Sequence, residues 1–177
     1  MQYTHAVIDL ETLSTRPEAV VVAIGAVKFD PSRDDGGMAP SLAGDPRRAF
    51  YRAAETPSQT DAGRKTDHAT LGWWCEQGIE ARRLTFPAMP TDTDQALRAF
   101  AAWMEGVEYL WGNGAAFDNA ILRSLCADYE VPYPVSYKGD MCVRTIELAA
   151  GVPKRDFIGI KHYALHDAFN EALVIQD

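Results

Sequence analysis

Residues 4–12 of the chain read THAVIDLET, an apolar run that closes with two carboxylates two residues apart. The aliphatic and β-branched residues at 4–10 predict a strand. A second run of this kind, AVVVAIGAVKFD at 19–30, follows after a short turn, and this spacing favours an antiparallel hairpin. The stretch AFYRA at 49–53 predicts a short third strand, so the chain opens with a cluster of strands.

After these strands the chain alternates between helical and extended stretches. One predicted helix, at 91–105, begins with a capping box formed by Thr91 and Asp94. Another begins at Asp140, an N-cap candidate. Asp, Gly, Pro and Ser dominate residues 31–48, which predicts a long surface loop. The predicted helices span 67–83 with a break near Gly78, 91–105, 116–130, 140 to about 150, and 161–176, and a further strand spans 107–114.

Strands followed by alternating helices predict an α/β fold, a mixed sheet with helices packed on its faces. With 177 residues, of which 47% are hydrophobic, the chain suits one globular domain over 1–177. No apolar run is long enough to span a bilayer, and the first residues lack the pattern of a signal peptide. We therefore expect a soluble, cytoplasmic protein without a membrane partner. Three widely spaced cysteines predict neither a disulfide framework nor a thiolate zinc site.

The charge balance argues against one class of nucleic-acid binder. The chain carries 17 basic and 25 acidic residues, a formal net charge of −8. A protein that coats nucleic acid nonspecifically usually has the opposite sign. A nuclease is not excluded, because clustered carboxylates that bind divalent cations attract phosphate once the cations are bound.

Asp9 and Glu11 are the first candidates for such a cluster. Residues i and i+2 of a strand point to the same face, so both carboxylates project together at the end of an apolar strand. Two carboxylates that close raise each other's pKa unless a cation lies between them. The alternative is an acidic strand end that simply enters solvent.

Two further acids are predicted to face the sheet. Asp118 shares a helix stripe with Ile121 and Leu122, the residues expected to pack on the strands. Asp167 lies beside a stripe of alanines at four-residue spacing, which lets its helix approach a neighbour closely. The alternatives are an acid that stabilises the dipole of a helix N-terminus, for Asp118, and a solvated edge position, for Asp167.

Two histidines lie near the second of these acids. His162 precedes Asp167 by five residues and enters the last helix, whereas His166 adjoins Asp167, and the spacing alone leaves both as candidates. Four carboxylates can bind hard divalent cations, and two such ions can clamp the attacking and leaving oxygens of a phosphoryl displacement. A neutral histidine can take the proton of the attacking water. Together these residues indicate metal-dependent cleavage of phosphodiester bonds.

Three segments resemble, in order, the exonuclease motifs of the DnaQ-like superfamily: VIDLET at 7–12, NGAAFDNAIL at 113–122 and HYALHDA at 162–168. The resemblance spans almost the whole chain. The His-x4-Asp spacing of the last segment matches the DEDDh branch and selects His162 over His166.

Two other segments narrow the resemblance further. TLGWWCEQGIEAR at 70–82 and DMCVRT at 140–145 resemble a small phage and bacterial group related to exonuclease VIII-like and phage exonuclease A-like proteins.

The superfamily resemblance implies a ribonuclease H-like fold, a five-stranded mixed sheet flanked by helices. It implies a 3′-5′ exonuclease that releases nucleoside 5′-monophosphates from the 3′ end of DNA or RNA with two Mg²⁺ or Mn²⁺ ions. Asp9 would bridge both ions, Glu11 and Asp167 would hold the ion that activates water, Asp118 would support the other ion, and His162 would be the general base.

Substrate contacts are expected next to the first two motifs. Aromatic rings there can stack on bases, although a core position is the alternative for each ring. Of the adjacent Trp73 and Trp74 we expect one inside and one outside. The candidates for substrate binding are Thr12, Leu13, Asn113, Phe117 and Trp111.

Two other functions stay open for a chain with these motifs. One is a ribonuclease H-like endonuclease, against which the His-x4-Asp motif argues, and the other is a non-catalytic nucleic-acid-binding module on the same fold. The expected partner is the 3′ end of a single strand or overhang. DNA and RNA differ in the 2′-hydroxyl, which no short motif here encodes. The oligomeric state is open, with the homodimer as the state that many relatives adopt.

Overall fold

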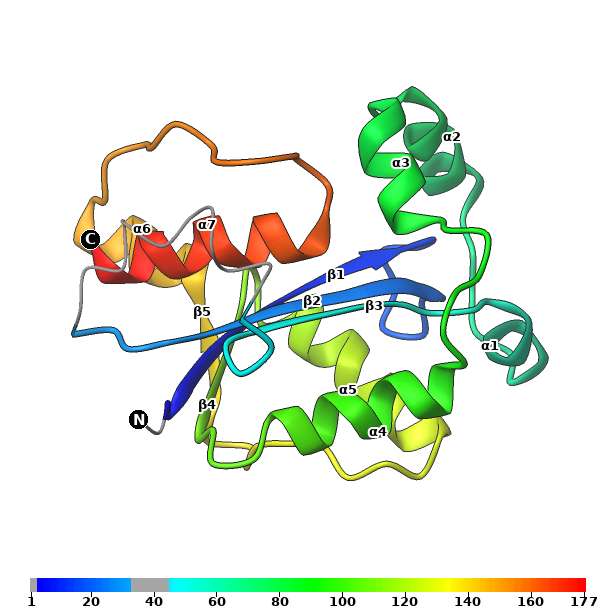
Figure 1. The fold of residues 1–177 in the computed structure, drawn as a ribbon, viewed down its shortest axis with the longest axis horizontal. Coiled ribbons are helices and arrows are strands. Elements are labelled where there is room, and N and C mark those ends of the chain that lie inside the picture. The colour runs from blue at the N-terminus through cyan, green and yellow to red at the C-terminus, as the bar shows by residue number, and fades with distance from the viewer. Residues whose placement is uncertain (1–2, 33–44) are drawn as a thin grey trace.

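The computed structural model describes residues 3–32 and 45–177, and its centre is a five-stranded sheet in the order β3-β2-β1-β4-β5 (Figure 1). Strand β1 (His5–Thr12) pairs antiparallel with β2 (Val21–Phe29), which pairs antiparallel with β3 (Ala49–Ala53). On its other side β1 pairs parallel with β4 (Tyr109–Gly112), and β4 pairs parallel with β5 (Asp140–Cys142). The predicted mixed five-stranded sheet is confirmed.

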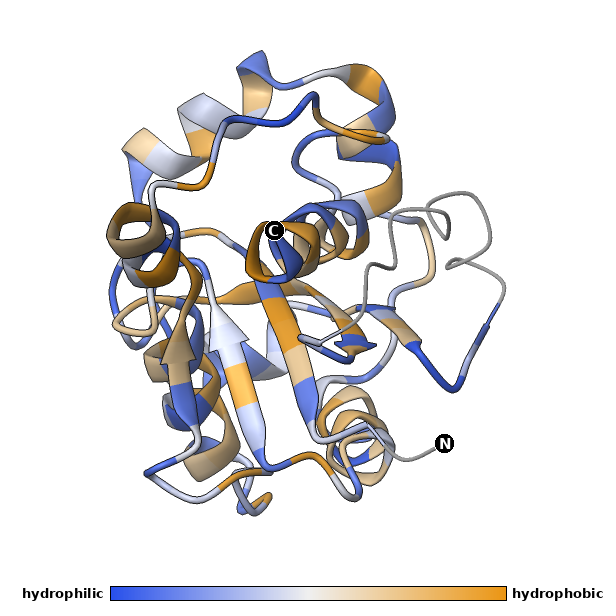
Figure 2. Ribbon diagram, turned by 90° about the vertical axis from the view of Figure 1, so that its left-hand side faces the viewer, coloured by the Kyte–Doolittle hydropathy of each residue, from blue (hydrophilic) through white to orange (hydrophobic). Residues whose placement is uncertain are grey.

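Helices cover both faces of this sheet. On one face α4 (Thr93–Trp103) and α5 (Asp118–Asp128) pack on a core that includes Ile8 and Leu10 of β1. On the other face α6 (Val143–Ala150) and α7 (Ala164–Gln176) pack on a second core that includes Val7. Figure 1 shows the two pairs of helices above and below the sheet, and Figure 2 shows hydrophobic residues along the strands between them. Successive side chains of β1 point to opposite faces of the sheet, so this strand contributes residues to both cores.

Three short helices connect β3 to α4. They are α1 (Pro57–Asp61), α2 (His68–Glu76) and α3 (Ile79–Thr85), and the break between α2 and α3 falls at Gly78, as predicted. The indole of Trp74 is 4% exposed and donates its Nε1 hydrogen to the carbonyl of Thr12 at 2.9 Å, which ties α2 to the end of β1. Its neighbour Trp73 is 39% exposed, so the expectation of one ring inside and one outside is confirmed.

Two local predictions are wrong. The N-cap of α4 is Asp92, whose carboxylate accepts from the amide of Gln95, and not Thr91. Asp140 does not cap a helix, because it begins β5, a three-residue strand too short to give a periodic signal. Its carboxylate instead accepts hydrogen bonds from Asn119, Arg123 and Tyr133.

The remaining predictions concern segments with little bearing on the site. Most of the predicted loop at 31–48 (residues 33–44) lies outside the described residues. The three cysteines are free thiols. In the described part of the chain, no helix has the length and apolar character that crossing a bilayer would require.

Candidate active site

The carboxylates of β1 lie on the face of the sheet that α7 covers. Val7 belongs to the core under α7, and Asp9 and Glu11 follow it at two-residue intervals, so all three point the same way. In the antiparallel register Asp9 pairs with Gly25 of β2. The sheet thus presents a carboxylate beside a residue that has no side chain.

Gly25 provides the seat for α7. A Cβ at this position would lie 2.2 Å from the carbonyl carbon of Ala164, the first residue of α7. Ala164 and Ala168 are fully buried, which confirms that the predicted stripe of small residues serves a close approach. Because α7 rests directly on β2 next to Asp9, Asp167 on its first turn reaches the β1 carboxylates.

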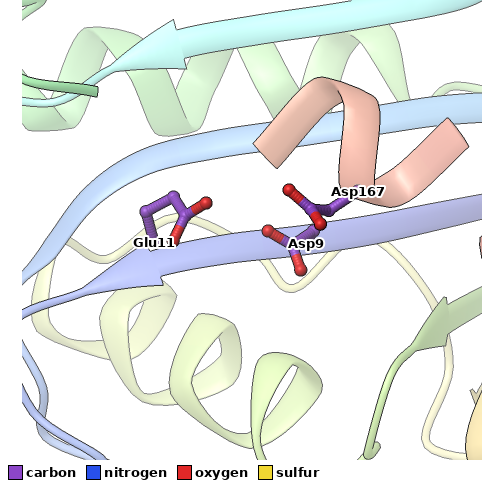
Figure 3. A group of neighbouring side chains, drawn as sticks. All are labelled: Asp9, Glu11 and Asp167. Carbon is purple, nitrogen blue, oxygen red and sulfur yellow. The ribbon is translucent and has the colours of Figure 1, made fainter. Parts of the chain in front are cut away.

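Asp9, Glu11 and Asp167 form one acidic trio, in which one oxygen of each carboxylate lies within 4.8 Å of the others (Figure 3). Burial, reinforced by the charges of Asp167 and Asp118, raises the pKa of Glu11 to about 8. Burial also raises the pKa of Asp167 to about 6. For Asp9, burial and then the charge of Glu11 hold the pKa well above its usual range. Without a cation, the trio therefore resists full ionisation.

Asp118 reaches the same site from the other face of the sheet. β4 pairs with β1 only as far as Ile8, so the next outward amide of β1, that of Leu10, has no strand partner on that side. The carboxylate Oδ1 of Asp118 accepts this hydrogen bond at 3.1 Å, and Asp118 is 2% exposed. Burial raises the pKa of Asp118 to about 7, although its backbone hydrogen bonds lower it. The predicted inward orientation is confirmed, but Asp118 stands beside the trio and is not part of it.

These carboxylates suit a hard divalent cation. They offer oxygen donors alone, which is the ligand set that Mg²⁺, Mn²⁺ and Ca²⁺ prefer. The oxygen Oδ2 of Asp167 is buried and has no hydrogen-bond partner among the described residues. A buried anion without a partner is costly, and a bound cation would compensate it.

The two candidate histidines differ in what they contact. His162 lies two residues before α7 with a positive φ of 62°, and its ring meets Trp73 edge to face with centroids 4.8 Å apart. Burial, and then Lys161, lower the pKa of His162, which keeps the imidazole neutral at physiological pH. The Nδ1 of His166 instead accepts the amide hydrogen of Ile160 at 2.9 Å. His166 thus anchors the segment before α7, while His162 adjoins Asp167 in a cavity.

Two cavities flank the acidic trio. One, of about 370 Å³, is lined by His162, Asp167 and the predicted Asn113. The other, of about 420 Å³, is lined by Glu11, by the predicted Thr12 and Phe117, and by Trp73, Leu10, Thr15, Ala69 and Thr70. Three of the five predicted substrate-binding residues therefore border a cavity next to the carboxylates.

The other two predicted substrate-binding residues lie in the core. Leu13 packs with Val20, Val22 and Trp74. Trp111 is 8% exposed, and its Nε1 donates to Nδ1 of His5 at 2.9 Å. The structure does not bring either residue to a cavity beside the carboxylates, so the core alternative holds for Trp111.

Glu171 is the site residue that the sequence reasoning missed. It lies one turn after Asp167 on α7, lines the cavity with His162, and is 8% exposed. The helical spacing could have indicated it, because residues i and i+4 of a helix share a face and Ala172 beside it continues the small-residue stripe. Glu171 lies outside the three motif segments, so the motifs do not point to it.

Comparisons with known proteins agree with this architecture. The family model described as the Rv2179c-like 3′-5′ exoribonuclease domain matches residues 4–177. Among solved structures the chain is similar to the nuclease domain of 3′hExo, a DEDDh family member, bound to rAMP. The two share 16% sequence identity with a TM-score of 0.63, over 97% of this chain and 90% of that one, which establishes the predicted ribonuclease H-like fold. No curated protein matches the chain.

Proposed function

We propose that RNA is the substrate of this chain, which belongs to the Rv2179c-like 3′-5′ exoribonuclease domain family. The chain is a metal-dependent 3′-5′ exonuclease of the DnaQ-like superfamily. One observation carries the proposal: the acidic trio lies in a domain that a family of exoribonucleases matches over residues 4–177. The similar solved structure was obtained with a ribonucleotide, rAMP, which supports the same substrate class.

In this proposal Asp9, Glu11 and Asp167 hold divalent cations, with Asp118 supporting them from α5. The cations would be two Mg²⁺ or Mn²⁺ ions, with Asp9 shared between them. When bound, such ions stabilise the charge that develops on the scissile phosphate and make water easier to deprotonate. The protein itself contributes the positions of the four carboxylates, which β1, α5 and α7 hold in place.

His162 is the proposed general base, as the His-x4-Asp spacing of the DEDDh branch implies. Its lowered pKa supports this role, because the imidazole must be neutral to accept a proton from the attacking water. The edge of Trp73 against the ring limits the orientations that the imidazole can take. His166 is not a rival, because its Nδ1 is already engaged by the backbone.

The two cavities would receive the two sides of the scissile bond. The cavity lined by Trp73 and Phe117 offers aromatic rings and the hydroxyl group of Thr70, which suits a terminal nucleoside. The cavity lined by His162 and Asp167 also carries Lys154 and Lys161, which suits the phosphate backbone.

Other parts of the proposal stay predictions. They are a single exonuclease domain over residues 1–177, a preference for single strands or overhangs, a homodimer, a cytoplasmic location, and kinship with the exonuclease VIII-like and phage exonuclease A-like group.

Digestion of two 5′-labelled single strands of equal sequence, one RNA and one DNA, tests the substrate. With Mg²⁺ or Mn²⁺ the RNA should shorten one nucleotide at a time from its 3′ end, faster than the DNA, and EDTA should stop the reaction. A circular RNA of the same sequence should survive, because an exonuclease needs an end. Faster loss of DNA would overturn the choice of RNA, and cleavage of the circle would favour the endonuclease alternative.

A further inference from the structure

Glu171 is a buried carboxylate that the function described above leaves without a role. It lies on α7 one turn after Asp167 and is 8% exposed. Its Oε2 has no hydrogen-bond partner among the described residues, and the same is true of Oδ2 of Asp167. The two acids on the inner face of α7 thus share a property that Asp118, bonded to the amide of Leu10, does not have.

The cavity that Glu171 lines places it beside the acidic trio, and its electrostatic surroundings agree with this position. Burial, and then the charge of Asp118, hold the pKa of Glu171 well above its usual range. In turn, Glu171 follows Glu11 among the charges that raise the pKa of Asp9. Glu171 also lines the same cavity of about 370 Å³ as Asp167 and Asn113. Glu171 therefore shares a cavity with Asp167, and its charge interacts with those of Asp9 and Asp118.

A structural role does not account for this side chain. A hydrogen bond from the Asn113 side chain lowers the pKa of Glu171, and the charge of Arg144 lowers it by less. The Arg144 guanidinium donates to the carbonyl of Asn113 at 2.9 Å, and no ion pair joins Glu171 to a described Lys or Arg. An unpaired buried carboxylate destabilises a fold unless a cation accompanies it.

We propose that Glu171 is a fifth carboxylate of the metal site, which helps to hold a divalent cation beside Asp9 and Asp118 before any nucleic acid binds. The inference rests on the proposed function in one respect, that the acidic trio binds divalent cations. Glu171 adds negative charge from α7, whereas Asp118 approaches from α5 and already bonds the amide of Leu10 through Oδ1. A cation held there would gain a ligand that the three motif segments do not supply.

The test is a calorimetric titration of the metal-free protein with Mn²⁺, without RNA. The variant Glu171→Gln keeps the size of the side chain and its bond with Asn113 but removes the charge, so Mn²⁺ affinity should fall by roughly 10- to 100-fold for one ion. Glu147→Gln is the matched control: Glu147 is a carboxylate of the same cavity, but it lies on α6 and is not among the charges acting on Asp9 or Asp118, so Mn²⁺ affinity should be unchanged. Wild-type affinity in Glu171→Gln would overturn the proposal.

Two further readouts separate a metal role from a structural one. Metal-free Glu171→Gln should melt no earlier than the wild type, because it loses a buried charge, whereas a structural carboxylate would lower the melting temperature and leave Mn²⁺ affinity intact. Glu171→Asp keeps the charge but withdraws it by one methylene, so it should require more Mn²⁺ without losing an ion. If Glu171→Gln fails to fold, wild-type Mn²⁺ affinity in Glu171→Asp overturns the proposal and weakened affinity supports it.

The same titration is independent of the nuclease assay. If the wild type binds Mn²⁺ more tightly than Glu171→Gln but does not degrade RNA, the choice of substrate fails and the role of Glu171 stands. If the wild type degrades RNA while both proteins bind Mn²⁺ equally, the proposed function stands and the role of Glu171 fails.

Discussion

Helices α5 and α7 approach β1 from opposite faces of the sheet, and each brings a carboxylate over a glycine. Under α5, Gly112 makes room for Asp118, whose oxygen is bonded to the amide of Leu10. Under α7, Gly25 makes room for the helix that carries Asp167 and Glu171, and each of these has a buried oxygen without a partner among the described residues. The α5 side is therefore fixed by the protein itself, while the α7 side would be completed by the proposed cation.

The largest effects should come from replacing Asp118 and Asp167, the acids that α5 and α7 bring to the site. Both Asp118→Ala and Asp167→Ala should lose essentially all RNA cleavage, because each removes a proposed support of the cation site. Their metal-free stabilities should differ. Asp118→Ala leaves the buried amide of Leu10 without an acceptor, which costs about 1–3 kcal/mol, whereas Asp167→Ala also relieves repulsion within the trio.

Chemical denaturation in EDTA measures this difference. The circular dichroism spectrum of each variant serves as the control for folding. Equal stabilities for the two variants would mean that the bond to Leu10 does not anchor the α5 side.

His162 and His166, both near the start of α7, should differ in their effects on rate and stability. His162→Ala should reduce the cleavage rate by about 100- to 10,000-fold, the usual contribution of a general base, and should still bind Mn²⁺. His166→Ala should keep most of the rate but lose stability, because the amide of Ile160 loses its acceptor. Single-turnover rates and melting temperatures of both variants give the answer, and a reversed pattern would transfer the base to His166.

The pH profile of the wild type adds a second measurement of His162. The rate should rise with pH as His162 loses its proton and then level off. Because burial lowers the pKa of His162, the plateau should begin below the usual range of a histidine. The same rise should be missing from His162→Ala.

Gly25 and Gly112 should differ in how well they tolerate replacement by alanine. A Cβ at Gly25 would meet the backbone of Ala164 at 2.2 Å, so α7 itself must shift in Gly25→Ala. A displacement of about 1 Å can reduce a rate by about 100-fold, and overpacking costs about 1–3 kcal/mol. A Cβ at Gly112 would meet the side-chain oxygen of Asn119 at 2.4 Å and Cβ of Asp118 at 2.9 Å, which are side-chain atoms, so the backbone of α5 need shift less. The cleavage rate should therefore fall more in Gly25→Ala than in Gly112→Ala. The opposite order would contradict the role of Gly25 in positioning α7.

The smallest expected effect concerns stability and pH. In the folded, metal-free protein the pKa of Glu11 is about 8, that of Asp118 about 7 and that of Asp167 about 6. Unfolded carboxyls have a pKa near about 4, so the folded state binds more protons between about pH 4 and pH 8. Stability contributed by these protonated groups is therefore lost as the pH rises through that range.

Bound cations should reverse this loss. Mn²⁺ at about 100 times its Kd should raise the melting temperature by roughly 5–10 °C near pH 8 and by less near pH 5.5, where protons compete for the carboxylates. Thermal scans with EDTA or Mn²⁺ at both pH values provide the comparison. A shift that is equal at both pH values would indicate that the metal binds away from the acidic trio.

The sequence was a good guide wherever side-chain alternation alone decides the outcome. The two-residue spacing of Asp9 and Glu11 predicts a shared face, and the alanine stripe beside Asp167 predicts a close helix contact, and both are confirmed. Asp118 was predicted to point inward, but its bond to Leu10 depends on where β4 stops pairing with β1. No local pattern encodes that register.

Other features escaped because they are too short or depend on distant partners. β5 has three residues, and Asp140 at its start resembles a helix cap because both positions favour an acid. Trp111 lies in β4 just before the second motif segment, yet the pairing of β4 with β1 directs its ring to His5 in the core. Glu171 carries no motif, and its burial follows from the depth at which α7 rests on Gly25.

The acidic trio joins the first strand of the described chain to its last helix, and this has a consequence for synthesis. A growing chain that has already formed its five strands still lacks Asp167, because α7 is synthesised after every other described element. The contact between Asp9 and Asp167 also spans most of the sequence, which places it among the slowest to form. We therefore expect a growing chain to be inactive toward nearby RNA until α7 has been synthesised.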